Sequence, residues 1–102
     1  MLPSTMAKEA LMHGIIRTYK YDKANGDAIT AIVKAEFVPL IESHEGFVEY
    51  HWIDSGDGEG ASMAIFEDKE SAEASTFIAG GFVHDRLADM ITSAPHIIEG
   101  AI

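Results

Sequence analysis

The sequence predicts a small α+β domain of ferredoxin-like type that pairs with a second copy of itself to form a dimeric α/β barrel. The 102 residues have room for one domain, and 47% of them are hydrophobic, as is typical of a globular chain. Strand-like and helical patterns follow in the order β, α, β, β, α, β, with one clear hairpin. The predicted strands carry large apolar side chains on both faces, although two helices can cover only one face of a sheet. The other face therefore needs a partner.

The first strand is expected over residues 12–21, where β-branched and aromatic residues are frequent and alternate along the chain. Residues 22–27 carry a turn signal, and Asp27 is typical of a helix N-cap. The hydrophobic residues that follow recur with the helical period and form one core-facing stripe: Ile29, Ile32, Val33, Phe37, Leu40, Ile41 and His44. Because Pro39 lacks a backbone donor, we expect a kink or a 3₁₀ turn near Val38, and Gly46 should end the helix.

A hairpin is expected next. Residues 46–53 predict an aromatic-rich second strand, residues 54–60 an acidic loop rich in glycine, and residues 61–66 the third strand. This hairpin supplies two of the four strands in the predicted sheet.

A second helix and a fourth strand complete the predicted fold. Asp68 should cap the helix, and Gly80-Gly81 should interrupt or weaken it. The helical period resumes afterwards in Val83, Leu87, Met90 and Ile91. Pro95 should end the helical segment, and residues 96–102 should form the last strand. We expect residues 1–11 to be a loose leader ahead of a single domain at residues 12–102.

Charge and composition exclude several classes of protein. Seventeen Asp and Glu residues against seven Lys and Arg residues give a formal net charge of −10, which disfavours nucleic acid and anionic membrane surfaces as partners. The sequence contains no stretch like a membrane span and no signal-like leader, so we expect a cytoplasmic protein. It also contains no cysteine, which excludes disulfides, thiolate metal sites and cysteine nucleophiles.

The alternation of side chains along the hairpin strands leads to the dimer. On the second strand, one face is expected to carry Val48, Tyr50 and Trp52 and the other Phe47 and Ile53. On the third strand, Ala64 and Phe66 should oppose Met63 and Ile65. A monomer rarely exposes so large an apolar face, so we expect a homodimer through the sheet face.

Several short segments resemble one protein family. They are Pro39-Leu40, the run EGFVEY at 45–50, Phe66-Glu67-Asp68 followed by Glu70, Ala72 and Ala74, and the run PHIIEG at 95–100. Over residues 12–102 the chain resembles the antibiotic-biosynthesis-monooxygenase-like (ABM-like) group of dimeric α/β barrels, in particular members without known activity. The resemblance implies a homodimer with a pocket between sheet and helices in each subunit. It also implies a reaction without cofactors, because some relatives oxidise small aromatic compounds with neither metal nor flavin.

Other relatives bind or degrade haem, and the sequence disfavours that branch. Haem-degrading relatives use an Asn on the first strand, a Trp on the third strand and a helix His. Here Asn25 lies in a predicted loop and Trp52 on the second strand, so of the three positions only a helix histidine, His84, is matched.

Two residues are candidates for catalysis. His84 falls at the edge of the apolar face of the second helix, from which it could look into a pocket, although such a histidine is more often a hydrogen-bonded surface residue. Glu36 lies on the stripe of the first helix, where burial would raise the pKa of its carboxyl group and suit it to act as a general base. The alternative for Glu36 is an edge residue that reaches the solvent.

Three residues are candidates for binding a substrate. Tyr50 and Trp52 could form the wall of a pocket for a flat aromatic molecule, or belong to the barrel core. Arg17 shares one face of the first strand with His13 and Tyr19 and could orient an anionic substrate group, or lie at the dimer interface. No metal is expected, because His13, His51 and His96 are scattered and lack the spacing of a metal site.

These residues allow three functions. The first is a cofactor-independent monooxygenase acting on a small aromatic or polyketide-like molecule. The others are a dimeric module that binds a small ligand without catalysis, and a structural or stress-related domain. The cavity between helices and sheet discriminates among them, because both ligand hypotheses lose ground if side chains such as Phe37 and Leu87 fill it.

Overall fold

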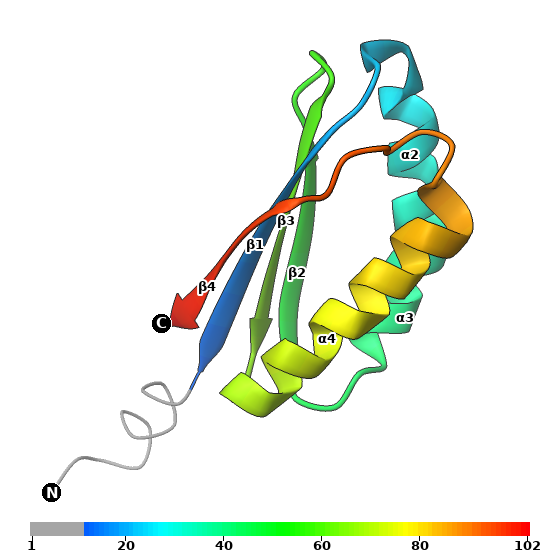
Figure 1. The fold of residues 1–102 in the computed structure, drawn as a ribbon. Coiled ribbons are helices and arrows are strands. Elements are labelled where there is room, and N and C mark those ends of the chain that lie inside the picture. The colour runs from blue at the N-terminus through cyan, green and yellow to red at the C-terminus, as the bar shows by residue number, and fades with distance from the viewer. Residues whose placement is uncertain (1–11) are drawn as a thin grey trace, which may run out of the picture.

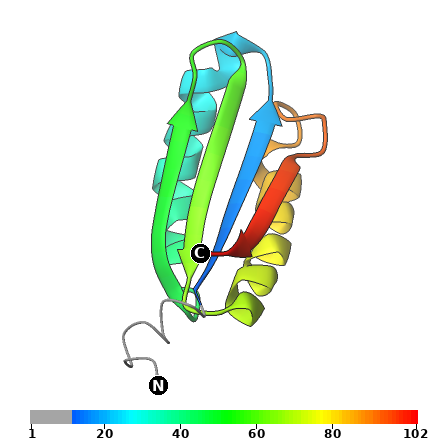
Figure 2. The same ribbon diagram turned by 90° about the vertical axis from the view of Figure 1, so that its left-hand side faces the viewer.

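The computed structural model describes residues 12–102, so the expected leader at residues 1–11 lies outside the described residues. Within that range four antiparallel strands form one sheet, and two helical segments cover one of its faces (Figure 1). The strands are β1 (His13–Lys20), β2 (Phe47–Asp54), β3 (Glu59–Phe66) and β4 (His96–Ala101). Their order across the sheet is β2-β3-β1-β4, with both crossovers helical (Figure 2). This arrangement confirms the predicted ferredoxin-like fold.

The first helical segment is continuous but irregular. A 3₁₀ turn, η1 (Lys23–Asn25), leads into α2 (Gly26–Ile32), a π-helical turn, η2 (Val33–Phe37), and α3 (Val38–Glu42). The cap at its start is Asp22, whose carboxylate accepts from the Ala24 amide at 2.9 Å, so the assignment of the N-cap to Asp27 is wrong.

Pro39 sits in the first turn of α3, where a missing amide hydrogen costs little. The expected irregularity appears one turn earlier as the wider π turn η2, rather than as a 3₁₀ turn. A proline ring crowds the carbonyl four residues before it, which is the backbone of this turn.

The second helical segment starts as predicted and is continuous where an interruption was predicted. Its helix α4 (Lys69–Phe82) is capped by Asp68, whose carboxylate accepts from the Ser71 amide at 2.7 Å. The expected interruption at Gly80-Gly81 is wrong, because α4 runs through both residues and ends in a π turn, η3 (Val83–Leu87). Glycine lowers helix propensity only by about 1 kcal/mol, which packing of the segment on the sheet overrides.

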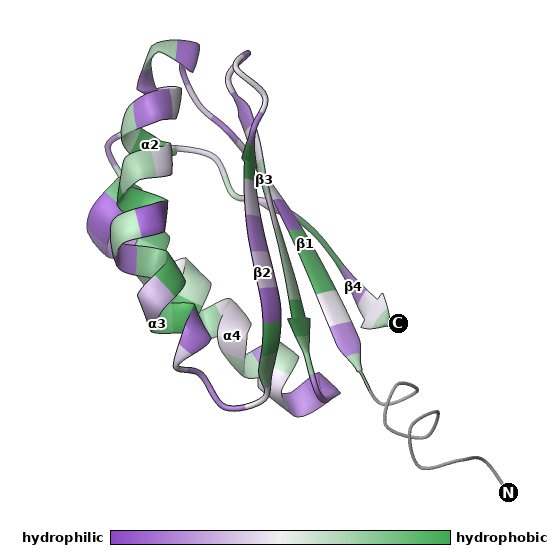
Figure 3. Ribbon diagram, turned by 180° about the vertical axis from the view of Figure 1, so that it is seen from behind, coloured by the Kyte–Doolittle hydropathy of each residue, from purple (hydrophilic) through white to green (hydrophobic). Residues whose placement is uncertain are grey.

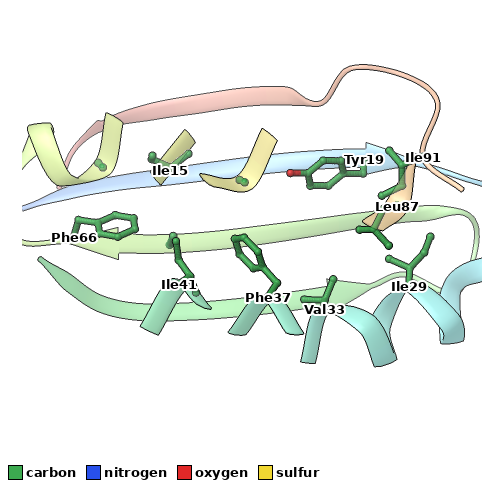
Figure 4. Close-up of a cluster of buried hydrophobic side chains, with 12 residues drawn as sticks. Ile15, Tyr19, Ile29, Val33, Phe37, Ile41, Phe66, Leu87 and Ile91 are labelled. Carbon is green, nitrogen blue, oxygen red and sulfur yellow. The ribbon is translucent and has the colours of Figure 1, made fainter. Parts of the chain in front are cut away.

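The hydrophobic core lies between the sheet and the helical segments (Figure 4). Phe66 and Ile41 lie toward one end of it, and Tyr19, Leu87 and Ile91 toward the other. Along the helices and strands, hydrophobic and hydrophilic residues alternate as this layering requires (Figure 3).

On β2 the expected split of side chains between the two faces is partly wrong. A register irregularity between Phe47 and Glu49 turns Phe47 to the helix side, where its ring meets that of Phe66 at a centroid distance of 6.2 Å. Val48 is left 40% exposed. A bulge adds one residue to a strand and so reverses the alternation that precedes it. On β3 the prediction is correct, since Ala64 and Phe66 are buried and Met63 is exposed on the other face.

The other face of the sheet stays open in the single chain, and it is the face seen in Figure 2. Ile16 lies at its centre, paired with Met63 on one side and Ile98 on the other. These three apolar side chains are 41%, 38% and 60% exposed. Among residues 12–102 no helix is long and apolar enough to cross a membrane.

Candidate functional site

The polar centre of the helix-covered face is Arg17, in the middle of β1. Strand alternation turns its side chain inward together with those of His13, Ile15 and Tyr19, which confirms that His13, Arg17 and Tyr19 share a face. That face meets the helices, so it is the interior and not the open sheet face.

Arg17 is only 2% exposed and has neutral partners. Its Nη2 donates to Ser75 Oγ at 3.1 Å and to Thr76 Oγ1 at 3.2 Å, both on α4. Its Nε has no hydrogen-bond partner within the described residues. Burial lowers the pKa of Arg17, although a guanidinium remains protonated at neutral pH. The site therefore contains a buried cation with an unused donor.

Aromatic rings lie beside this cation. Tyr19 and Trp52 have ring centroids 6.1 Å apart, and Tyr50 lies 5.4 Å from Phe37. The Trp52 indole donates to Thr30 Oγ1 at 3.0 Å, which fixes the ring against α2. Gly60 on β3 makes room for it, because a Cβ there would lie 2.6 Å from the indole.

The two tyrosines are neutral hydrogen-bonding groups. Burial raises the pKa of Tyr50, and the neighbouring Tyr19 raises it further. Burial also raises the pKa of Tyr19, which is 7% exposed, against the opposing effect of Arg17. Both phenols keep their protons at physiological pH and can act as donors or acceptors, not as bases.

Most of the interior is filled with side chains. A cavity of about 20 Å³, room for one water molecule, remains between the sheet and the helical segments. Its walls include Arg17, Tyr50 and Trp52 from the sheet and Phe37 and Leu87 from the two π turns. Side chains such as Phe37 and Leu87 therefore fill most of the space between helices and sheet, and this inner cavity is too small for an organic ligand.

A larger cleft adjoins the inner cavity and opens to solvent. It has a volume of about 480 Å³ and lies between β1, α4, the π turn η3 and the connection at residues 92–95. Arg17 and Tyr19 line both the cavity and the cleft, so they form the boundary between them. A cleft of this size is within the range of roughly 300–1,000 Å³ found for small-molecule sites.

The five predicted site residues fall into four places. Tyr50 and Trp52 line the inner cavity, and Arg17 lies between cavity and cleft. His84 borders the cleft, with a side chain 86% exposed and its Nδ1 3.0 Å from Asp85 Oδ1.

Glu36 lies away from the cavity and the cleft. Its carboxylate accepts from Arg86 Nε at 2.7 Å and from Arg86 Nη2 at 2.9 Å on the outer surface of the helical layer. The expectation of a desolvated carboxyl group with a raised pKa is wrong, because the Arg86 guanidinium lowers the pKa of Glu36. Glu36 lies within the π-helical turn η2, in which Val33 and Phe37 are the buried residues. Glu36 is therefore at the exposed edge of the apolar stripe.

Sequence reasoning missed the residues that hold Arg17. Ser75 is fully buried on α4 and lies on one stripe with Ala72 and Ala79, three and four residues away. A hydroxyl residue in phase with buried alanines is a signal that an interior polar group faces it. The histidines considered for a metal do not converge, since His13 faces the helices and His51 the open face. Among residues 12–102 no three His, Asp or Glu side chains are placed to hold a metal ion.

Comparisons with known proteins give matches of fold alone. No protein-family model and no curated protein sequence matches the chain. A protein of unknown function from Nitrosomonas europaea superposes with a TM-score of 0.77 at 16% identity, over 92% of this chain and 91% of that one. A monooxygenase from Streptomyces coelicolor, solved in complex with nanaomycin D, gives a TM-score of 0.71 at 12% identity, over 98% and 94%.

A second protein from Nitrosomonas europaea, provisionally named an antibiotic biosynthesis monooxygenase, gives a TM-score of 0.74 at 11% identity, over 91% of each chain. The described chain thus has the ferredoxin-like fold of ABM-like proteins, as the resemblance implied.

Proposed function

We propose that this chain, with its ABM-like fold, is a dimeric, cofactor-independent monooxygenase that acts on a small aromatic or polyketide-like molecule bound in the cleft. The observation that carries the proposal is the cleft of about 480 Å³, which ends on Arg17 and Tyr19. Apolar side chains such as Val83, Ile91 and Ile97 form much of its remaining wall and suit a flat hydrophobic ligand. The Streptomyces coelicolor neighbour, a monooxygenase, supports the reaction class.

The proposed reaction needs no external reductant, because the substrate supplies the electrons. A phenol with one free ring C–H position reacts with O₂ to give a quinone and water. One oxygen atom becomes the new ring carbonyl, and the other leaves as water with the two hydrogens that the phenol loses. The protein must then bind the ring, orient it and exchange protons. His84, at the border of the cleft, is our candidate for proton exchange.

A second candidate is a binding module without catalysis. Its support is the placement of the titratable groups: the His84 side chain is 86% exposed and paired with Asp85, and Glu36 is occupied by Arg86 outside the cleft. No carboxylate of residues 12–102 lines the cleft. A base that is not held against the substrate transfers protons poorly, because general catalysis requires hydrogen-bond reach.

We also propose that two copies associate through their open sheet faces. The row Met63, Ile16 and Ile98 spans three neighbouring strands, and Ile102 adds to it against Gly14. A second copy of the chain is the partner that fits this face best. A two-fold axis packs the apolar row of one copy against the same row of the other, so both rows are covered. Two sheets packed in this way bury their inner faces at a spacing of about 10 Å.

The experiment for this proposal measures oxygen uptake and Trp52 fluorescence with phenols, quinones and haem as test ligands. Trp52 is the one tryptophan in the chain, and its ring lies 6.1 Å from Tyr19, so a flat ligand against Tyr19 should quench it saturably. Oxygen uptake that is lost in His84→Ala supports the monooxygenase.

The control for that variant is His96→Ala, since His96 is an exposed histidine at the start of β4 that does not line the cleft. Saturable quenching without oxygen uptake would leave the binding module. No quenching by any test ligand would defeat both ligand-based functions and leave the structural domain.

A further inference from the structure

The charge on Arg17 is not balanced by the residues that surround it. Arg17 is only 2% exposed as a residue, and the two hydrogen bonds of its guanidinium go to the hydroxyl oxygens of Ser75 and Thr76, which carry no charge. Within residues 12–102 no carboxylate forms an ion pair with it. Glu99 is the one carboxylate among the described groups that affect the pKa of Arg17; it raises that pKa less than the other groups do, and its Oε2 lies 3.7 Å from His13 Nε2.

The cleft beside Arg17 is free of acidic residues. The chain carries 17 Asp and Glu residues and a formal net charge of −10, yet none of the described residues that line the cavity or the cleft is acidic. Arg17 and His84 are the groups of basic type in these walls. An anion that enters the cleft therefore meets a cation without meeting a carboxylate.

One hydrogen-bond donor of Arg17 is not used by the described residues. Nη2 is occupied by Ser75 and Thr76, and these two bonds hold the guanidinium plane, whereas Nε–H has no partner. A buried donor without a partner is unfavourable for folding, so each such group calls for an explanation, and use by a ligand is one. An anionic oxygen would satisfy both the donor and the charge.

From these observations we propose that Arg17 is an anion-binding residue and that the ligand of the cleft is a small planar organic acid. Its carboxylate meets Arg17, and its aromatic or conjugated body lies along Tyr19 and the apolar wall of the cleft. The inference rests on the proposed function for the aromatic body and goes beyond it for the charged group.

The experiment compares three probes of graded chemistry, which are benzoate, its neutral isostere benzamide, and acetate. Binding is measured by calorimetry and by the shift of the Arg17 Nε–H resonance in ¹⁵N spectra at fixed low chloride. A charge-assisted hydrogen bond in a buried site should make benzoate bind at least about tenfold more tightly than benzamide. The Nε–H resonance should shift with benzoate and not with benzamide.

Variants then assign the preference to one residue. Arg17→Met should remove the preference for benzoate while benzamide binds as before, and Arg17→Lys should keep part of it, since it retains the charge but loses the planar fork. Arg86→Met makes the same change at an arginine outside the cleft, which Glu36 already pairs, and should leave the preference intact. Circular dichroism checks that each variant is folded.

The outcomes separate this inference from the proposed function. Equal binding of benzoate and benzamide would overturn the anion site while leaving an aromatic-binding cleft. Acetate binding with an Nε–H shift, but without binding of either aromatic probe, would support the anion site and overturn the aromatic ligand. No Nε–H shift with either acid would overturn the inference altogether.

Discussion

Replacing Arg17 with methionine should leave the protein at least as stable as the wild type, although Arg17 is one of its most buried side chains. The variant loses two hydrogen bonds from a charged donor, worth about 1.5–3 kcal/mol each. It also removes a desolvated charge that costs several kcal/mol, and an unpartnered Nε–H that costs about 1–3 kcal/mol. The free energy lost with the hydrogen bonds and the free energy recovered by removing the buried charge and donor therefore nearly cancel.

The groups left behind are satisfied. Ser75 Oγ keeps its hydrogen bond to the Ala72 carbonyl at 2.6 Å, and Thr76 is only half-buried, so water can reach it. We therefore expect the free energy of unfolding to rise by about 0–2 kcal/mol, which is a rise in Tm of up to about 10 °C for a domain of this size.

The measurement is chemical and thermal unfolding at one fixed protein concentration, because association would otherwise shift the midpoint. Leu87→Ala is the comparison, a neutral truncation at a residue 2% exposed that should cost about 2–5 kcal/mol. A loss of 2 kcal/mol or more in Arg17→Met would refute the reasoning and make Arg17 a structural tie between β1 and α4.

Three further predictions concern the rest of the fold. Met63→Asp should convert a particle of twice 11.1 kDa into one of 11.1 kDa in sedimentation, because it buries a charge between sheet faces; a wild-type monomer would contradict the dimer. Gly46→Ala should lower the free energy of unfolding by about 1–3 kcal/mol, since Gly46 has φ +80° and its added Cβ would collide with Ser71, whereas Gly56→Ala at φ +86° meets nothing and should lose less. Asp68→Ala should lower Tm at pH 7. Because hydrogen bonds from Ser71 lower the pKa of Asp68, this deficit should shrink as the pH falls through that lowered pKa, which lies below the ordinary range of an Asp carboxyl group.

The fold was predictable because its signals are local. Alternation along β1, the apolar stripe of the first helical segment and the cap at Asp68 each depend on a few neighbouring residues. The predictions that are wrong concern residues whose position depends on contacts with distant parts of the chain. Phe47 faces the helices because of a bulge against β3, and α4 continues through Gly80 because the sheet supports it.

The site was predictable only in part for the same reason. The alternation of side chains along β1 places Arg17 and Tyr19 on the same face of the sheet. The strand alone does not indicate which face the helices cover. Glu36 was misjudged because its partner, Arg86, lies 50 residues away in sequence.

Arg17 is an exception to the rule that core residues are apolar or have their hydrogen bonds satisfied. Residues of the core elsewhere are apolar or have their hydrogen bonds satisfied, whereas Arg17 is charged, buried and held by two neutral hydroxyls. A carboxylate on α4 in place of Ser75 or Thr76 would compensate the charge, but it would also consume the cation. Two hydroxyls instead orient the guanidinium and leave its charge available at the inner end of an open cleft. Proteins break local rules of this kind mainly at functional sites, so the same uncompensated charge that makes Arg17 costly to bury suits it to an anionic ligand.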